Sequence, residues 1–155
     1  MRYLMTLTAV LVLAACGDDP LSPDERDSQL PNGSMSARVD GDAWTATAAL
    51  AVAYTGGILA FAGSDASQVT IGLGFIPDGL KTYPIGPSEP TNGNLSLGST
   101  QSWAASASMG SGTVTLTSFT ANSASGTFMF VADPVASTGA TGTRSVTEGV
   151  FDVTF

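Results

Sequence analysis

The sequence predicts an all-β domain, a single antiparallel β-sandwich with a small closed β-barrel as the alternative. In several stretches, such as residues 69–75 and 113–117, apolar residues alternate with polar or small ones. Half-buried antiparallel strands alternate in this way because successive side chains point to opposite faces of the sheet. Short turn signals separate these stretches, and no stretch keeps apolar residues at the 3.6-residue spacing of a helix.

Residues 1–15 are predicted to be a signal peptide. A positively charged start and an uncharged apolar run precede two alanines and Cys16. Secretory signals have this order, and the run is shorter than the roughly 20 apolar residues that a membrane-spanning helix needs. Residues 13–17, Leu-Ala-Ala-Cys-Gly, resemble the bacterial lipobox. The resemblance implies cleavage before Cys16, lipid attachment to this residue and a membrane anchor in the cell envelope. Gly17, which follows the cysteine, favours the outer membrane by the same resemblance.

Residues 16–34 are predicted to be a lipidated N-terminus followed by an acidic, disordered tether. Between residues 17 and 33 there are five acidic residues, three prolines and a single base, Arg26. A segment without a periodic apolar face does not repay the entropy cost of ordering. Because Cys16 is the only cysteine, no disulfide can form within the chain.

Residues 35–155 are predicted to form the β-domain, with eight or nine strands. The Ala-rich run 46–53 is interpreted as a strand because threonine, valine and tyrosine favour strands and a Gly-Gly pair follows. Near the C-terminus the apolar alternation changes parity across Glu148-Gly149, which predicts a Gly-containing β-bulge. The predicted turns are Asp40-Gly41, Gly56-Gly57, Gly63-Ser64-Asp65, Pro77-Asp78-Gly79, Asn92-Gly93, Gly110-Ser111-Gly112 and Asn122-Ser123.

The composition excludes several classes of function. Five basic residues against thirteen acidic ones argue against binding of nucleic acid, whose phosphates require basic patches. The chain has no histidine, which excludes Ser-His-Asp and Cys-His systems and histidine metal sites. Lys81 is interpreted as a surface charge rather than a catalytic base. We therefore predict no catalytic residue, no metal site and no cofactor.

The remaining candidates for chemistry are acids and aromatic side chains. Paired carboxylates could support glycoside hydrolysis, but nearly all the candidate acids lie in or beside turn signals, where Asp caps the backbone. Calcium at Asp40-Gly41-Asp42 is disfavoured because no second acidic cluster lies nearby in the sequence. Four aromatic residues are interpreted as core, with a stacking surface for a sugar or apolar ligand as the alternative. The candidates are Asp40, Asp42, Asp65, Asp78, Glu89, Asp133, Glu148 and Asp152 among the acids, and Trp44, Tyr54, Tyr83 and Trp103 among the aromatics.

Four stretches of the β-domain resemble an uncharacterised bacterial lipoprotein family known as domain of unknown function 6252. These are residues 37–44 (ARVDGDAW), 112–119 (GTVTLTSF), 125–130 (SGTFMF) and 148–153 (EGVFDV). The resemblance spans nearly all of residues 36–155, with a poor match over 83–109. It implies an exported, lipid-anchored β-domain and transfers no catalytic residue.

From these observations we expect a cell-envelope lipoprotein whose β-domain is a non-catalytic binding or structural module. The expected partners are the membrane, through Cys16, and a protein or small molecule that the sequence does not identify. Two alternatives stay open at this point. One is a carboxylate-based glycan hydrolase, and the other is a carrier of a small ligand.

Overall fold

The computed structural model describes residues 32–155. The predicted signal peptide, Cys16 and the tether up to residue 31 lie outside the described residues. The described part is all-β, as predicted, and it contains no helix that could cross a membrane. Its eleven strands are β1 (Gly33–Val39), β2 (Asp42–Thr45), β3 (Ala49–Thr55), β4 (Ile58–Ser64), β5 (Val69–Phe75), β6 (Thr82–Ile85), β7 (Asn92–Leu97), β8 (Gln101–Ala105), β9 (Ser111–Phe119), β10 (Ser123–Pro134) and β11 (Arg144–Thr154).

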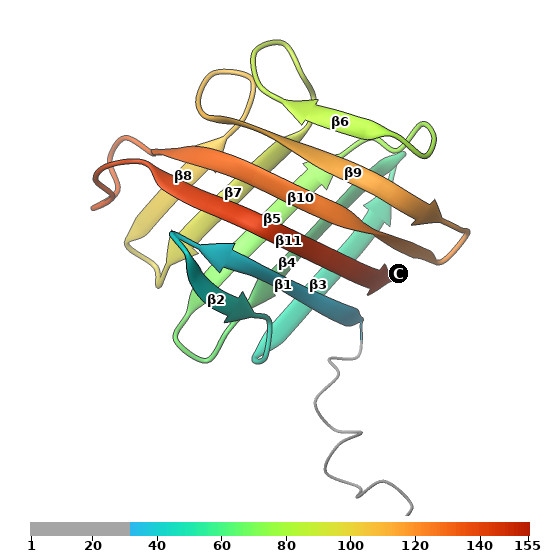
Figure 1. The fold of residues 1–155 in the computed structure, drawn as a ribbon, viewed down its shortest axis with the longest axis horizontal. Coiled ribbons are helices and arrows are strands. Elements are labelled where there is room, and N and C mark those ends of the chain that lie inside the picture. Colours follow the sequence, from blue (N-terminus) through green and yellow to red (C-terminus); the bar gives the residue numbers. More distant parts are fainter. Residues whose placement is uncertain (1–31) are drawn as a thin grey trace, which may run out of the picture.

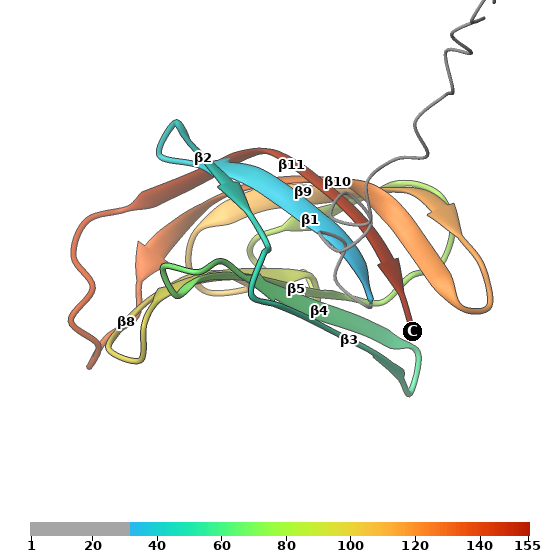
Figure 2. The ribbon, with the colours of Figure 1, turned by 90° about the horizontal axis from the view of Figure 1, so that it is seen from below.

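The strands form two antiparallel layers that cross each other (Figure 1). One layer has the order β2-β1-β11-β10-β9-β6, and the other has the order β3-β4-β5-β7-β8. Figure 2 shows the layers one above the other. They are joined along one side, because Asp133 and Pro134 at the end of β10 pair with Ala104 and Trp103 of β8. The fold is therefore a sandwich that is continuous at one corner, as in a partly opened barrel.

The core lies between the two layers and contains the inward-facing residues of both. Alternate residues of β10 are buried, including Phe128 and Phe130, and the intervening Met129 and Val131 are exposed. The rings of Phe61 and Phe151 meet across the layers with centroids 4.8 Å apart. This alternation is the period-two pattern on which the all-β prediction rested.

The predicted β-bulge in β11 is confirmed. Ser36 of β1 pairs with Val150 and Arg38 pairs with Thr147, so β11 has one more residue than its neighbour between these pairs. The left-handed backbone conformation falls on Glu148, which has φ of 51°. Gly149 serves a different purpose, because a Cβ atom there would lie 2.6 Å from the ring of Phe128. The glycine makes room for an aromatic ring.

The turn between β1 and β2 is confirmed, with positive φ at both Asp40 (51°) and Gly41 (93°). This is the pattern of a type I′ hairpin. The predicted turn at Asn92-Gly93 is wrong, because both residues lie in β7. Gly93 faces the core, and a Cβ atom there would lie 2.9 Å from the ring of Phe130. The glycine that is typical of a hairpin is here required by close packing against Phe130.

The run 46–53 contributes to a strand, as predicted, but β3 begins only at Ala49. The preceding residues connect the two layers. The amide of Ala46 donates to the carbonyl of Met35 in β1, and the amide of Ala48 donates to the carbonyl of Ser64 in β4. β1 itself begins at Gly33, slightly before the predicted start of the domain at residue 35.

Candidate functional site

Asp40 lies at the centre of the best-defined polar contact among the candidate acids. Its side chain accepts hydrogen bonds from Arg144 Nη1 (2.6 Å) and from the Ser145 amide (2.8 Å), which places the β1–β2 turn against the start of β11. Partial burial by itself raises the pKa of Asp40, but the hydrogen bonds from Arg144 and Ser145 outweigh it, so the pKa is lowered. The Arg144 guanidinium also lies 4.9 Å from the ring centre of Trp103.

Three of the candidate acids border the same hollow. Asp40, Asp42 and Asp65 line a depression of about 270 Å³, together with Arg144 and Trp44. The carboxylate oxygens of Asp40 face Arg144 and Ser145, and Asp65 Oδ1 accepts from the amides of its own turn. Among residues 32–155, no three Asp, Glu, His or Cys side chains are grouped closely enough to hold a metal ion.

The other acids are spread over the surface, and several of them hold turns or strand ends. Asp133 accepts from the amide of Gly110 at 2.8 Å, and Glu148 accepts from Arg38 Nε at 2.9 Å. Asp78 pairs with Lys81 at 2.7 Å, and the hydrogen bond from Lys81 lowers the pKa of Asp78 against the opposing effect of desolvation. The three remaining candidates lie in exposed or half-buried positions on β2, in the loop after β6 and on β11, namely Asp42, Glu89 and Asp152.

Three of the four aromatic candidates lie in the core, which confirms that interpretation for them. Trp44, Tyr83 and Trp103 are each at most 5% exposed. Their polar atoms have partners within the fold: Trp44 Nε1 donates to the carbonyl of Val69 and Trp103 Nε1 to that of Gly142. Tyr54 is different, because it is 41% exposed at the end of β3.

Tyr54 forms part of an aromatic cluster at one end of the sandwich. Its ring centre lies 5.6 Å from that of Phe119 and 5.2 Å from that of Phe155. The three rings come from β3, from the end of β9 and from the chain terminus, and they close the end of the core between the layers. Their contacts with one another show a packing role for Tyr54 that leaves part of its ring in solvent.

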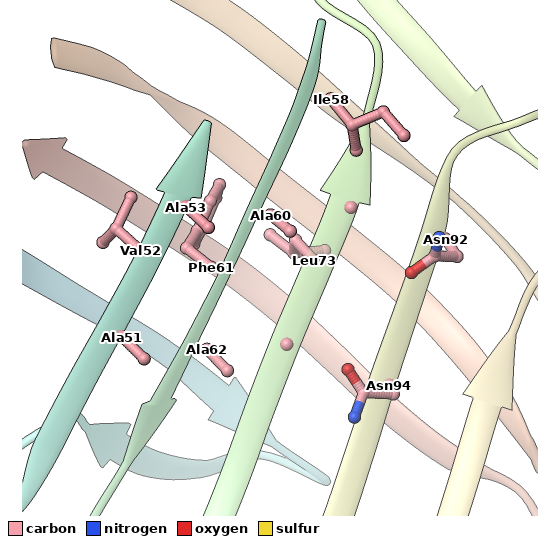
Figure 3. Close-up of a pocket in the computed structure, with 12 residues that line it drawn as sticks. Ala51, Val52, Ala53, Ile58, Ala60, Phe61, Ala62, Leu73, Asn92 and Asn94 are labelled. Atoms are coloured by element: carbon pink, nitrogen blue, oxygen red, sulfur yellow. The ribbon is translucent and has the colours of Figure 1, made fainter. Parts of the chain in front are cut away.

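A shallow depression of about 430 Å³ lies on the outer face of β3, β4, β5 and β7 (Figure 3). Alanines of β3 and β4 lie on one side of β5, and Asn92 and Asn94 of β7 lie on the other. None of the residues that line it carries a charge, so it presents methyl groups, peptide backbone and two amides that can both donate and accept. Strand pairing aligns these residues in two rows, Ala51-Ala62-Gly72-Asn94 and Ala53-Ala60-Gly74-Asn92.

This depression was not recognised from the sequence, although the residue pattern that forms it is present there. Each contributing strand repeats one small residue at a spacing of two: Ala-x-Ala twice, then Gly-x-Gly and Asn-x-Asn. Asn94 lies directly over Gly72, where its amide oxygen occupies the space that a Cβ atom would need. The glycines thus allow the asparagine side chains to lie flat on the sheet.

Comparison with known families gives one match. The family model described as Domain of unknown function (DUF6252) matches residues 31–153, which is most of the chain. The chain belongs to this family. The matched range of DUF6252 begins just before β1 and ends in β11, so the family domain coincides with the two-layered fold. No curated protein and no solved structure matches the chain.

Proposed function

We propose that this protein is a lipid-anchored cell-envelope protein whose β-domain acts as a non-catalytic binding or structural module. The observation that carries the proposal is that most of the candidate carboxylates form structural hydrogen bonds within the fold. Five of the eight candidate acids accept hydrogen bonds within the fold: Asp40, Asp65, Asp78 and Asp133 at turns or strand ends, and Glu148 between β11 and β1.

The direction of the pKa shifts supports the same proposal. A carboxyl group that acts as a general acid at neutral pH needs a raised pKa. The pKa values of Asp40 and Asp78 are lowered instead, because Arg144 and Lys81 donate hydrogen bonds to their charged forms. Both side chains are therefore ionised at neutral pH, which suits a structural contact better than proton donation.

We expect Asp40→Asn to lower the free energy of unfolding at neutral pH by about 0.5–1 kcal/mol, since the carboxylate is 35% exposed and solvent weakens the pair. The folded-state pKa of Asp40 lies below its unfolded value, so this stabilisation is present above the unfolded pKa and is lost as the pH falls through the folded one. The difference between variant and native protein should therefore close below about pH 4. Urea unfolding across the pH range measures it.

The matched control is Asp42→Asn, an exposed position in the same hairpin, for which we expect almost no change. Replacing a catalytic acid often stabilises a protein, because active sites are strained for function. If Asp40→Asn increases stability, or leaves it unchanged at neutral pH, the carboxylate is not a structural contact and the argument against an acid catalyst fails at this residue.

The anchoring part of the proposal is supported by the lipobox-like sequence that ends at Cys16. Two or three acyl chains at this residue would hold the protein firmly, whereas one chain gives only reversible membrane binding. Sixteen residues lie between Cys16 and the start of β1 at Gly33. Such a segment spans at most about 60 Å, which limits how far the β-domain can lie from the membrane.

We expect Cys16→Ser to abolish lipid attachment, leaving uncleaved precursor or a soluble, mis-cleaved form. Mass spectrometry of the membrane and soluble fractions measures both the acyl mass and the first residue of the mature chain. Ser28→Ala, in the segment between the cysteine and the domain, is the matched control and should stay acylated. Native protein that is soluble, unacylated and cleaved elsewhere than at Cys16 would contradict the anchor.

A further inference from the structure

One margin of the folded sheet lacks the features that usually protect an edge strand. Short length, charged residues and proline all discourage pairing with other chains. Two margins have them, since β2 and β6 are four residues long and contain Asp42 and Pro84 respectively. The third margin is β3, with seven residues of sequence ALAVAYT, no charge and no proline.

The hairpin that joins β3 to β4 determines which backbone groups of β3 point outward. Its two-residue loop, Gly56-Gly57, has positive φ at both positions, and Thr55 pairs with Ile58. In such a hairpin the pair next to the loop is hydrogen-bonded, so every second residue back from Thr55 faces β4. The backbone groups of the intervening residues, Leu50, Val52 and Tyr54, point to the open side.

One of these outward groups is already used. The side chain of Asn32 donates from Nδ2 to the carbonyl of Leu50 at 2.9 Å. Within residues 32–155, no backbone group forms a hydrogen bond with the outward backbone groups of Val52 or Tyr54. The open stretch of the edge is therefore centred on Ala53.

We propose that β3 pairs with β3 of a second copy of this chain, antiparallel and with the two-fold axis at Ala53. In this register the N–H and C=O of Val52 both form hydrogen bonds with the partner's Tyr54. By symmetry, Tyr54 forms the same two hydrogen bonds with the partner's Val52. A register centred on Val52 would need the carbonyl of Leu50, which Asn32 occupies. Because an antiparallel strand pair is self-complementary, the contact is isologous and closes at two copies.

The side chains at this edge fit a second copy of themselves. Across the axis Ala53 lies opposite the partner's Ala53, and Ala51 lies opposite the partner's Thr55. No like charges meet there, although the whole chain has a formal net charge of −8. On the inner face Tyr54 lies beside the partner's Val52, which covers part of an exposed ring. The uncharged depressions on the outer faces of the two copies become continuous across the axis.

Disulfide trapping tests the register. Residues 16–155 with Cys16→Ser have no thiol, so an added cysteine is the only one present. In Ala53→Cys the two cysteines form a non-hydrogen-bonded pair, with Cβ atoms close to the separation that a disulfide needs. We expect a covalent dimer under mild oxidation. Ala51→Cys is the matched control, because the two cysteines would lie about 13 Å apart along the strands and should not link.

Sedimentation of the same chain without added cysteine tests the dimer itself. We expect twice the monomer mass for the parent chain and monomer mass for Ala53→Lys, which brings two ammonium groups together at the axis. Asn94→Lys, on the same face but three strands away, should stay dimeric. Circular dichroism checks that all variants keep the strand spectrum.

A monomeric parent chain would overturn the proposal. So would a dimer that Ala53→Lys leaves intact, because the interface would then lie elsewhere, and so would equal cross-linking of the cysteine variants at 51 and 53. The proposal does not depend on the lipid anchor, so its failure and that of the proposed function are separate results.

Discussion

Trp103→Ala is expected to lower the free energy of unfolding by about 3–5 kcal/mol, the usual cost of truncating a large buried aromatic residue. Trp103 is 1% exposed and pairs with Pro134 where the two layers join. Its Nε1 donates to the carbonyl of Gly142 at 2.8 Å, and its ring faces Arg144. The substitution therefore leaves a cavity, a carbonyl without its donor and a guanidinium without its ring.

Such a loss is a large share of the about 5–15 kcal/mol by which small domains are stable. Urea unfolding followed by circular dichroism measures it as a lower midpoint at unchanged slope. Trp103→Phe, which keeps an aromatic ring but loses the indole N–H, should fall between the native protein and the alanine variant. If the alanine and native proteins unfold at the same midpoint, the layers are not held together at this corner.

Gly126→Ala is expected to cost close to the upper end of the about 1–3 kcal/mol that is typical of overpacking. Gly126 faces the core from β10, and its Cβ atom would overlap the carbonyl oxygen of Thr115 and lie 2.8 Å from the Phe151 ring. Both neighbours belong to paired strands, so relief requires movement of β10 against β9 or of the ring within the core.

The matched control is Gly86→Ala. A Cβ atom at this position meets no atom within 4 Å, and the residue is not among those with positive φ. We expect the control to unfold within about 0.5 kcal/mol of the native protein. Equal midpoints for the two alanine variants, measured by urea unfolding, would show that β10 and β9 do not lie as closely as described.

The elements that could be predicted from the sequence are those in which local pattern and tertiary packing require the same residues. The bulge in β11 is one, because a change of apolar parity at Glu148-Gly149 leaves no other way to keep the bulky residues inside. The pair Asn92-Gly93 is the opposite case. Locally it favours a turn, but the ring of Phe130 requires a glycine in the middle of β7.

Contacts between distant parts of the sequence could not be predicted. Asp40 and Arg144 are 104 residues apart, and nothing in either local sequence indicates that a turn and a strand start will meet. The depression on the outer face of β3, β4, β5 and β7 could not be predicted for a different reason. Alanine, glycine and asparagine have no distinctive chemistry, and their alignment becomes meaningful only when the strand register is known.

The corner at which β10 passes from one layer to the other also determines when the domain can fold. β10 pairs with β9, β11 and β8, and β1 is held between β2 and β11. A growing chain that has not yet reached residue 123 therefore has neither β10, the strand that joins the layers, nor β11, the second neighbour of β1. The two-layered fold can therefore be completed only when the last fifth of the sequence is present, and such non-local pairing is typical of slowly folding β-domains. The layer β3-β4-β5-β7-β8 has all its strands by residue 105, but the core on its inner face cannot be closed until nearly the whole chain has been made.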